Sequence, residues 1–547
     1  MNLSEKMKKR LFIPIIAIAT LLATVSFKSD FFEIAKQIEI FTTLFKEVNM
    51  NYVDETNPAE LMDNAIEGML DGLDPYTKYW TEQEVEDAKI SRSGDYSGIG
   101  ATVRRTKDKK MIIVEPRKGY PADLAGLKAG DEIIKIGDIV VADTEGDPGD
   151  LLKGSAGSVV EITYLRQGVS KTSSVKRGAV EIDAVPFYEL INGDTGYIVL
   201  TKFNRKASAQ VKEALESLKT DGATKIILDL RGNGGGLLNE AVKICGHFLP
   251  KSSLITTTKS VVKKYNQTYK TPNEPVDTKI PLVVLVNGRS ASASEIVSGS
   301  LQDYDRAVIV GARSFGKGLV QRPKPLTYGT QLKVTISRYY TPSGRCIQAL
   351  DYWNRDEKGN AVRTDKKDFK KFKTANGRTV FDGGGVFPDI EVSSAKTSPI
   401  TKALLKDNAI FEYATAYYYK HQYSNLSEFT FTDADYQEFR QYLDQTGFNY
   451  ETETEKAFAK ALEQAKKDEL DESINTAYIN LQKTITQAKN AELEEHQTEI
   501  KAQLIDEIVK RYFYRDGLYT YQIQNNKEIA EAVSVLGNSR RYTKILK

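Results

Sequence analysis

The stretch TKIILDLRGN, residues 224–233, decides the fold class, because its continuous apolar run is typical of a strand covered on both faces. PLVVLVNG, residues 281–288, has the same character, and TGYIVLTKF, residues 195–203, is also strand-like. Amphipathic helical patterns separate these strands at residues 208–220 and 239–249. We therefore expect an α/β core with a central sheet over residues 181–400, with its reactive loops beyond the carboxyl ends of the strands.

The rest of the chain divides by texture into four further segments. Residues 29–93 have helical apolar spacing, and residues 94–180 carry short β-like runs punctuated by glycine, which favours a small, partly open barrel. Residues 401–547 hold long charged helical stretches, for which we expect a C-terminal helical domain that binds an adaptor or a second copy. Residues 1–28 are a signal peptide or membrane anchor, so a multidomain α/β protein is predicted.

Composition excludes several classes of function. The 547 residues carry a net charge of only +2, which gives no electrostatic reason to bind nucleic acid. Two cysteines exclude a disulfide framework, and three histidines argue against a histidine-rich metal site. We therefore expect no metal and no organic cofactor.

The N-terminus has the pattern of an export signal. A basic flank that ends at Arg10 precedes the apolar segment Leu11–Phe27, whose 17 residues are at the short limit for spanning a bilayer. Either a cleaved signal or a retained anchor places everything after Lys28 outside the cytoplasm. We expect an exported protein that is either released outside the cytoplasm or membrane-anchored on the extracytoplasmic side.

Two strand-to-loop junctions carry the chemistry. The first runs through Gly234 and Gly235, where a tight turn presents backbone N–H groups to a developing negative charge or to a phosphate. The second is NGRSASASE, residues 287–295, in which small residues surround a serine. No histidine is near, so the candidate base is a lysine kept neutral by burial. Lys317 has glycine and apolar neighbours, and a helix would place Gln321 on its face, where the amide would orient the amine.

Within residues 94–180 the sequence resembles a PDZ domain. Ser97-Gly98-Ile99-Gly100 stands in the place of the carboxylate-binding loop, and GLKAGDEIIKIGD follows at residues 126–138. Glycines allow backbone N–H groups to turn toward an anion. The resemblance implies capture of protein or peptide substrates by their free, apolar C-termini, which add to a sheet edge.

The motifs together resemble those of the carboxyl-terminal processing proteases, also called tail-specific proteases. They are LDLRGNGGG (228–236), SASASE (290–295), FGKGLVQ (315–321), RYYTPSGRCIQ (338–348) and FPD (387–389), over a resemblance that runs from about residue 40 to 395. The resemblance implies that Ser292 is the nucleophile, Lys317 the general base and Gln321 the residue that positions it.

The same resemblance implies an oxyanion hole that uses the backbone N–H of Ala293 and of Gly234 or Gly235. Ser290 and Ser294 are competing nucleophiles, and only the family spacing, with Lys317 following Ser292 by 25 residues, selects Ser292. Two alternatives stay open. One is an exported PDZ scaffold that binds peptides without cleaving them, and the other is a metal or redox centre built on Cys245-Gly246-His247 with Cys346.

Overall fold

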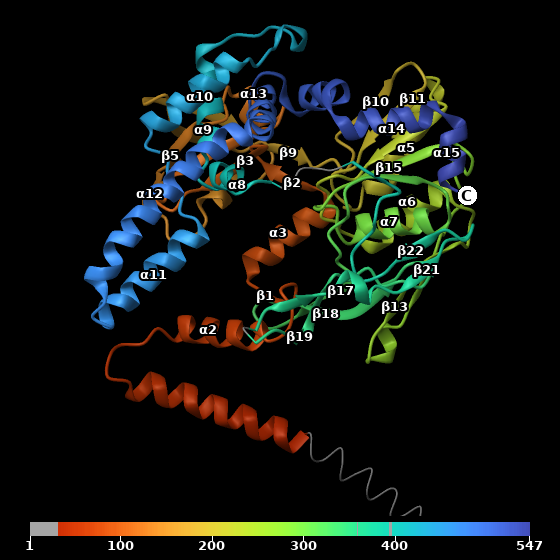
Figure 1. Cartoon of the computed structure of the whole chain (residues 1–547). Helices are drawn as coiled ribbons and strands as arrows, with labels where there is room; N and C mark the ends of the chain where they lie inside the picture. Colours follow the sequence, from red (N-terminus) through yellow and green to blue (C-terminus); the bar gives the residue numbers. More distant parts are fainter. Residues whose placement is uncertain (1–30, 358, 393–396) are drawn as a thin grey trace, which may run out of the picture. The chain divides into compact units, whose positions relative to one another are not determined.

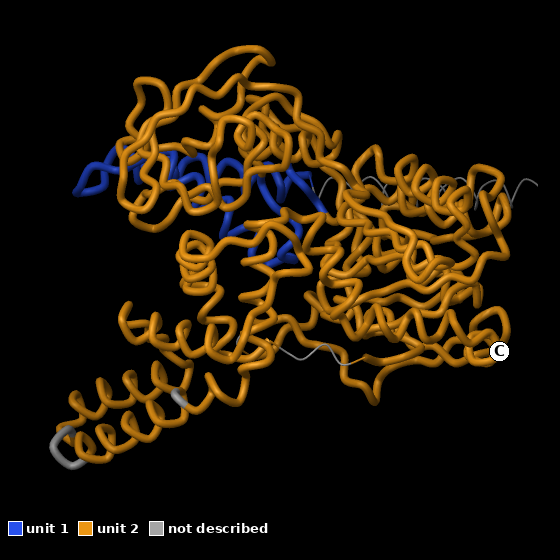
Figure 2. Tube along the Cα trace, turned by 90° about the horizontal axis from the view of Figure 1, so that it is seen from above, with its two compact units in different colours: residues 1–79, 332–334 blue, residues 80–331, 335–547 orange. Residues whose placement is uncertain are grey.

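The computed structural model describes residues 31–547 except 358 and 393–396. The chain folds as two compact units, one of residues 1–79 with 332–334 and one of residues 80–331 with 335–547 (Figure 2). The predicted export segment, Leu11–Phe27, lies outside the described residues. Within the part of the chain that is described, no helix is both long and apolar enough to cross a membrane.

The first unit is helical, as the apolar spacing predicted. Residues 31–51 form one helix and α2 (Pro58–Asp71) forms the next. The Asn57 side chain accepts from the N–H of Ala59 and Glu60, and Pro58 occupies the first helical position, so α2 begins there for a local reason. The chain then turns through Asp74, which accepts from the N–H of Tyr76, and leads into β1 (Lys78–Trp80).

A six-stranded, mostly parallel sheet forms the centre of the second unit (Figure 1). Its order is β10-β11-β12-β15-β16-β23, and only the β10–β11 pair is antiparallel. The bounds are β10 (Phe187–Ile191), β11 (Thr195–Val199), β12 (Lys225–Asp229), β15 (Leu282–Val286), β16 (Val308–Gly311) and β23 (Ile390–Glu391). The predicted strands within residues 195–203, 224–233 and 281–288 are confirmed.

Both faces of this sheet are buried, and alternate residues of each strand serve different cores. Ile226, Leu228 and Val284 face α5 (Ala207–Thr220), α6 (Leu238–Phe248) and α7 (Ala293–Asp303). Ile227 and Val283 face α14 (Lys527–Gly537), which comes from the C-terminal region. The two-faced burial predicted from the continuous apolar runs is therefore confirmed, and α14 provides the cover on the second face.

A separate β domain precedes this core. Its sheet has the order β3-β4-β5-β7-β8, with β6 against β5, and it surrounds a small apolar core that includes Ile113 and Leu127. The bounds are α3 (Glu82–Ser93), β2 (Asp95–Gly98), β3 (Ala101–Arg105), β4 (Met111–Pro116), α4 (Pro121–Leu124), β5 (Glu132–Ile136), β6 (Ile139–Val140), β7 (Val159–Arg166), β8 (Val169–Lys176) and β9 (Gly178–Glu181). β3 and β8 are the edge strands of this sheet.

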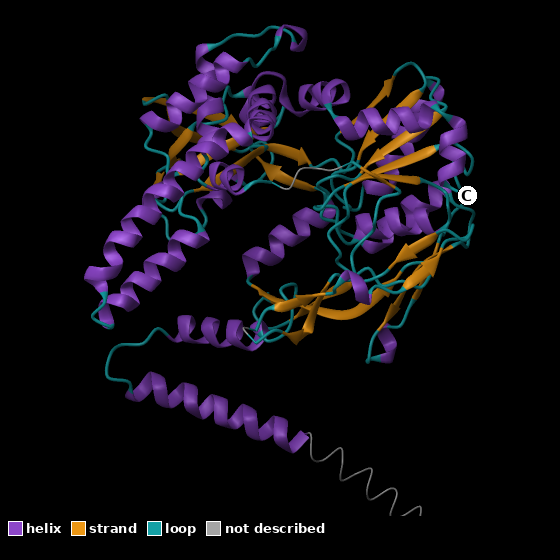
Figure 3. Ribbon diagram, viewed as in Figure 1, coloured by secondary structure: helices purple, strands orange, loops and turns teal. Residues whose placement is uncertain are grey.

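Figure 3 shows further strands and helices outside the central sheet. The strands are β13 (Leu254–Lys259), β14 (Thr268–Lys270), β17 (Leu319–Pro325), β18 (Gln331–Tyr340), β19 (Leu350–Arg355), β20 (Ala361–Arg363), β21 (Lys371–Lys373) and β22 (Thr379–Phe381). The helices are α8 (Pro399–Lys406), α9 (Ala409–Lys420), α10 (Asp433–Gln445), α11 (Glu453–Lys467), α12 (Asp471–Glu495), α13 (Gln497–Asn525) and α15 (Ser539–Ile545).

Helices α8 to α10 and α13 share an apolar core of their own, which confirms a helical region after residue 400. Helix α13 also contacts the β domain. Arg515 makes two hydrogen bonds of 2.6 Å to the carboxylate of Glu115, and the Tyr514 hydroxyl donates to Asp123 over 2.6 Å. That these helices bind an adaptor or a second copy stays a prediction.

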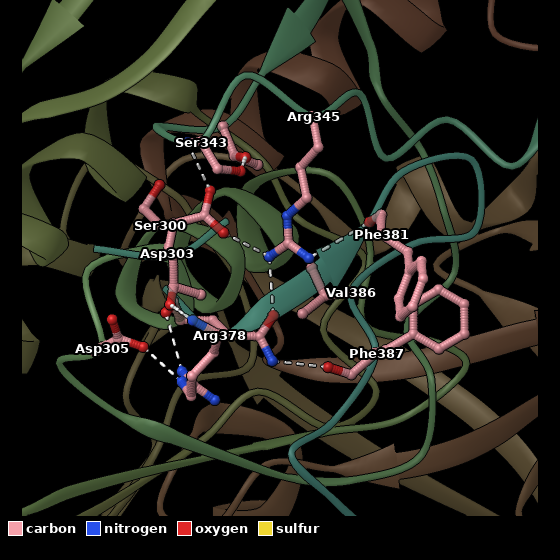
Figure 4. Close-up of polar contacts among 12 residues, drawn as sticks. Ser300, Asp303, Asp305, Ser343, Arg345, Arg378, Phe381, Val386 and Phe387 are labelled. Carbon is pink, nitrogen blue, oxygen red and sulfur yellow. Dashed lines mark hydrogen bonds and ion pairs between the residues drawn. The ribbon is translucent and has the colours of Figure 1, made fainter. Parts of the chain in front are cut away.

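A buried charge cluster fixes the carboxyl end of α7 (Figure 4). The Arg345 and Asp303 side chains are 0% and 1% exposed and lie 2.8 Å apart. Arg345 also donates to the Gln302 side chain over 2.8 Å, and Asp303 accepts from the N–H of Ser343. Arg378 pairs with Asp305 and with Asp389 of the FPD motif. Two of the sequence motifs therefore anchor the helix that begins beside Ser292.

Removing one partner of the Arg345–Asp303 ion pair tests how much this pair contributes to stability. Arg345→Met leaves the Asp303 carboxylate buried without its countercharge, which should lower the free energy of unfolding by about 3–5 kcal/mol. Asp303→Asn combined with Arg345→Met should recover at least half of that loss, because neither charge then remains. Urea unfolding followed by circular dichroism measures both variants. A loss below about 1 kcal/mol for the single variant would contradict the assignment.

Candidate active site

The two loops that the sequence singled out are joined by hydrogen bonds. The Ser290 hydroxyl donates to the Leu230 carbonyl over 2.8 Å, and the Ser294 hydroxyl donates to the Asn233 carbonyl over 2.8 Å. The same Asn233 carbonyl accepts from the N–H of Ala291 over 3.0 Å. The glycine turn after β12 and the serine segment after β15 therefore form one structural unit at the carboxyl edge of the sheet.

Burial separates Ser292 from the two competing serines. Ser290 and Ser294 are both 0% exposed, and their hydroxyls hold the loops together. Ser292 is partly exposed and immediately precedes α7, with a φ of 57° that non-glycine residues rarely adopt. Its carbonyl accepts from the buried Tyr339 hydroxyl over 3.2 Å, which helps to hold this conformation.

One fully buried carboxylate connects the serine with the lysine. Glu295 Oε2 accepts from the backbone N–H of Ser292 over 2.8 Å and from that of Lys317 over 2.9 Å. Glu295 Oε1 accepts from the Ser314 hydroxyl over 2.5 Å and from the N–H of Gly316 over 2.7 Å. Burial raises the pKa of the Glu295 carboxyl, and these hydrogen bonds oppose the rise. Ser292 and Lys317, which are distant in sequence, therefore meet at one oxygen atom.

The Lys317 segment is held from its other side by the RYYTPSGRCIQ motif. The N–H of Gly318 donates to the Gln348 side chain over 2.7 Å, and the Gly318 carbonyl accepts from the N–H of Tyr339 over 2.9 Å. Lys317 itself is partly buried. Sequence reasoning missed roles for Glu295, Tyr339 and Gln348. Only the S-x-x-E spacing of residues 292–295, which resembles a helix capping pattern, pointed to Glu295.

Gln321 lies on a strand, so the helical arrangement considered for it is wrong. β17 runs from Leu319 to Pro325, and its backbone is extended because it belongs to a β-sheet. The Gln321 side-chain amide donates to the Thr335 hydroxyl over 3.1 Å. Lys317 precedes this strand, so strand alternation does not by itself place Lys317 and Gln321 on one side.

The glycine turn lies directly against the start of α7. A Cβ at Gly235 would lie 2.9 Å from Ser292 Cβ and 3.0 Å from Ala293 N, and the φ of Gly235 is +99°, so this position requires glycine. The Gly235 N–H already donates to the Asn233 side chain over 2.9 Å. The Gly234 N–H has no hydrogen-bond partner among the described residues, and Ala293 N–H is one of the first, unsatisfied donors of α7.

The C-terminal region reaches this turn through Arg231. Arg231 pairs with Asp229 over 2.6 Å, and it donates to the Asn526 side chain, which caps α14, over 2.7 Å. Glu528 in the first turn of α14 lies 3.3 Å from the same guanidinium. The residue that enters the glycine turn is therefore held by the helix that covers the sheet.

The SGIG loop is held by hydrogen bonds to two of its backbone carbonyl groups. The Ile99 carbonyl accepts from the N–H of Ala122, and the Gly100 carbonyl accepts from the N–H of Arg117. In a trans peptide the N–H points opposite to the carbonyl, so the N–H groups of Gly100 and Ala101 point away from these partners. The Ile99 side chain is 2% exposed and belongs to the domain core, and Ser97 and Gly98 pair with β9.

The cysteine alternative finds no support in the described part of the chain. Both cysteines are free thiols, and burial raises the pKa of the Cys245 thiol well above its usual range. His247 Nε2 lies 2.9 Å from the Ser208 carbonyl, to which it donates. No group of three His, Cys, Asp or Glu side chains that would suit a metal ion occurs among the described residues.

Comparison with known proteins identifies the class. The model of peptidase family S41 matches residues 194–352, that of the PDZ domain matches residues 97–176, and one described as a probable PDZ-protease C-terminal helical domain matches residues 400–536. The chain belongs to peptidase family S41 and is a serine-type peptidase with a PDZ domain.

Named relatives are carboxy-terminal-processing proteases. The carboxy-terminal-processing protease of Bartonella bacilliformis is 37% identical over 326 residues, which cover 58% of this chain and 73% of that one. A probable CtpA-like serine protease of Staphylococcus haemolyticus is 34% identical over 318 residues, 57% of this chain and 63% of that one. A solved photosystem II D1 C-terminal processing protease is 26% identical, covers 64% of this chain and 86% of that one, and has a TM-score of 0.36.

Glu295→Gln tests the bridging carboxylate. The amide nitrogen would face N–H donors in place of an acceptor, so the Ser292 and Lys317 segments should separate slightly. Because misplacement by about 1 Å costs about 100-fold, kcat should fall by about that factor with KM little changed. Rates of peptide hydrolysis, measured from limiting to saturating substrate concentrations, give kcat and KM. A variant that is folded, by circular dichroism, and keeps full kcat would contradict a positioning role.

Proposed function

We propose that the protein is an exported endopeptidase with a Ser292–Lys317 dyad that processes or degrades proteins from their C-termini. The observation that carries the proposal is the pair of hydrogen bonds to Glu295 Oε2, from Ser292 at 2.8 Å and from Lys317 at 2.9 Å. Both donors are backbone N–H groups, so the backbone at the partly exposed Ser292 and the backbone at Lys317 are held next to each other. The burial of Ser290 and Ser294 supports Ser292 as the nucleophile.

The reaction that we propose is acyl transfer. The neutral amine of Lys317 accepts the proton of the Ser292 hydroxyl, whose oxygen then attacks the scissile carbonyl. The N–H groups of Ala293 and Gly234 stabilise the resulting oxyanion, since Gly235 N–H is already bonded within the turn. Lys317 next protonates the leaving amine, and water releases the acyl group. Gln321, on β17, orients the lysine amine.

We further propose that the PDZ domain captures substrate C-termini. The outward N–H groups of Gly100 and Ala101 suit a terminal carboxylate, and the free edge of β3 suits a peptide strand. The basic and apolar N-terminal segment supports export, with the enzyme periplasmic or anchored outside the cytoplasm. Protease digestion of intact and of permeabilised spheroplasts distinguishes this location from a cytoplasmic one.

Ser292→Ala and Lys317→Ala should each reduce cleavage of an unfolded protein with an apolar C-terminus by at least about 1000-fold, because each removes a member of the dyad. Ser290→Ala and Ser294→Ala are matched controls. They remove structural hydrogen bonds, each worth about 1 kcal/mol of stability, and should retain cleavage. A chain lacking residues 1–28, followed by gel electrophoresis and mass spectrometry, gives the readout.

The outcome separates this enzyme from a peptide-binding scaffold. Cleavage by the parent but not by the dyad variants supports the protease. If the parent binds the substrate and leaves it intact, the scaffold alternative is favoured. If Ser290→Ala or Ser294→Ala, confirmed as folded, abolishes cleavage while Ser292→Ala does not, the assignment of the nucleophile is wrong.

Amidation of the substrate C-terminus tests capture by the PDZ domain without changing the protein. A peptide that ends in an apolar residue with a free carboxylate should be cleaved with a kcat/KM at least about tenfold higher than its amide, because charge-assisted hydrogen bonds to the loop are lost. Both peptides contain the same internal sequence around the scissile bond, so any difference in rate comes from the C-terminus. Equal rates for acid and amide would contradict C-terminal recognition.

A further inference from the structure

A cavity of about 820 Å³ is lined in part by Gln321, the residue that we propose to orient the lysine amine. It lies between the start of α6, β17, β18 and the hairpin of β13 and β14, and Figure 1 labels α6, β13, β17 and β18. Gln321 and Val320 line it from β17, and Leu237, which follows the glycine turn, lines it from the other side. Lys317 lies two residues before β17 and Leu237 directly follows Gly236, so part of a polypeptide held at the dyad would lie close to this cavity.

Basic side chains predominate in the lining of the cavity, which holds Arg205, Lys243, Lys264, Lys270 and Arg322 beside Glu240. Lys264 and Arg322 line it, and together with Lys324 they surround the ring of Tyr265 at distances of 5.3, 5.6 and 5.4 Å from the centroid. Lys324 also hydrogen-bonds the Tyr265 hydroxyl, and this bond with the neighbouring charges lowers the pKa of Tyr265. These three side chains form the basic wall.

The basic wall has no acidic counterpart within the described chain. Lys264, Arg322 and Lys324 form no ion pair with any described Asp or Glu. Glu240, the acidic residue that lines the cavity, is already paired with Lys243 over 2.7 Å and accepts from the N–H of Ser208 over 3.0 Å. Because the whole chain carries only +2, this local excess is not a property of the chain in general.

We propose that the basic wall makes the enzyme selective for substrates with Asp or Glu within a few residues of the scissile bond. The proposal rests on the proposed function and adds a substrate class to it. Carboxylates suit this wall because guanidinium and ammonium groups bind them through charge-assisted hydrogen bonds. Leu237, Val242 and Ile336 add apolar lining, which suits a polypeptide better than an isolated inorganic anion.

The test compares two peptides that differ only next to the scissile bond. Both have the same apolar, free C-terminus, and one carries two Asp residues on each side of the bond where the other carries Asn. At low salt the Asp peptide should have a kcat/KM about tenfold higher, and in 1 M NaCl, where the Debye length falls to about 3 Å, the ratio should approach one. A ratio near one at low salt overturns the proposal.

Lys264→Gln, Arg322→Gln and Lys324→Gln combined should bring the Asp-to-Asn ratio at low salt to about one to two. The matched control is Lys456→Gln, Lys460→Gln and Lys466→Gln on α11, which removes the same total charge from an exposed helix of the helical region. It should keep the parental ratio. A triple variant of the wall that retains the ratio, or a control that loses it, overturns the proposal.

Binding separates failure of this proposal from failure of the proposed function. Fluorescence anisotropy with the Ser292→Ala protein measures the affinity of each peptide without hydrolysis. A tenfold preference for the Asp peptide supports the basic wall even if the parent cleaves neither peptide, in which case only the protease assignment fails. A single-stranded oligonucleotide that binds more tightly than the Asp peptide, and loses affinity in the wall variant, would assign the wall to nucleic acid instead.

Discussion

A single carboxylate oxygen sets the distance between two segments that the chain brings from different parts of the fold. Glu295 Oε2 accepts from the backbone of Ser292, which begins α7, and from that of Lys317, which precedes β17. Its partner oxygen ties down Ser314 and Gly316. A carboxylate that is buried away from solvent must accept its hydrogen bonds from protein donors. Burial of Glu295 is therefore stable only when both loops are in place. The relative placement of the Ser292 and Lys317 backbones thus follows from satisfying one buried carboxylate.

The loops themselves depend on a sheet that is covered on both faces. Strands β12 and β15 end side by side, and the hydroxyls of Ser290 and Ser294 bind carbonyl groups of the turn that follows β12. Arg231 leads into this turn, and its guanidinium donates a hydrogen bond to Asn526, the N-cap residue of α14. The C-terminal helices therefore take part in the architecture of the catalytic domain, beyond whatever partners they bind.

Much of this arrangement was predictable because it has local causes. Runs such as IILDL and LVVLV are apolar without alternation, which happens when both faces are buried, and glycine at residue 235 reflects contact with Ser292. Other features depend on tertiary contacts. Gln321 lies on a strand whose pairing with β18 sets its conformation, and Glu295 bridges loops distant in sequence. Helix α14 begins at Lys527, 138 residues after Asp389, so local sequence patterns do not predict these contacts.

The position of α14 in the chain has a consequence for biosynthesis. A polypeptide is made from its N-terminus, so all six strands of the central sheet leave the ribosome before residues 527–537 do. Until then the face that carries Ile227 and Val283 has no cover from α14, and Arg231 lacks Asn526. The nascent chain accordingly passes through a stage with an exposed apolar sheet and an unanchored glycine turn. Proteolytic competence is thus acquired late, after the helical region has been synthesised.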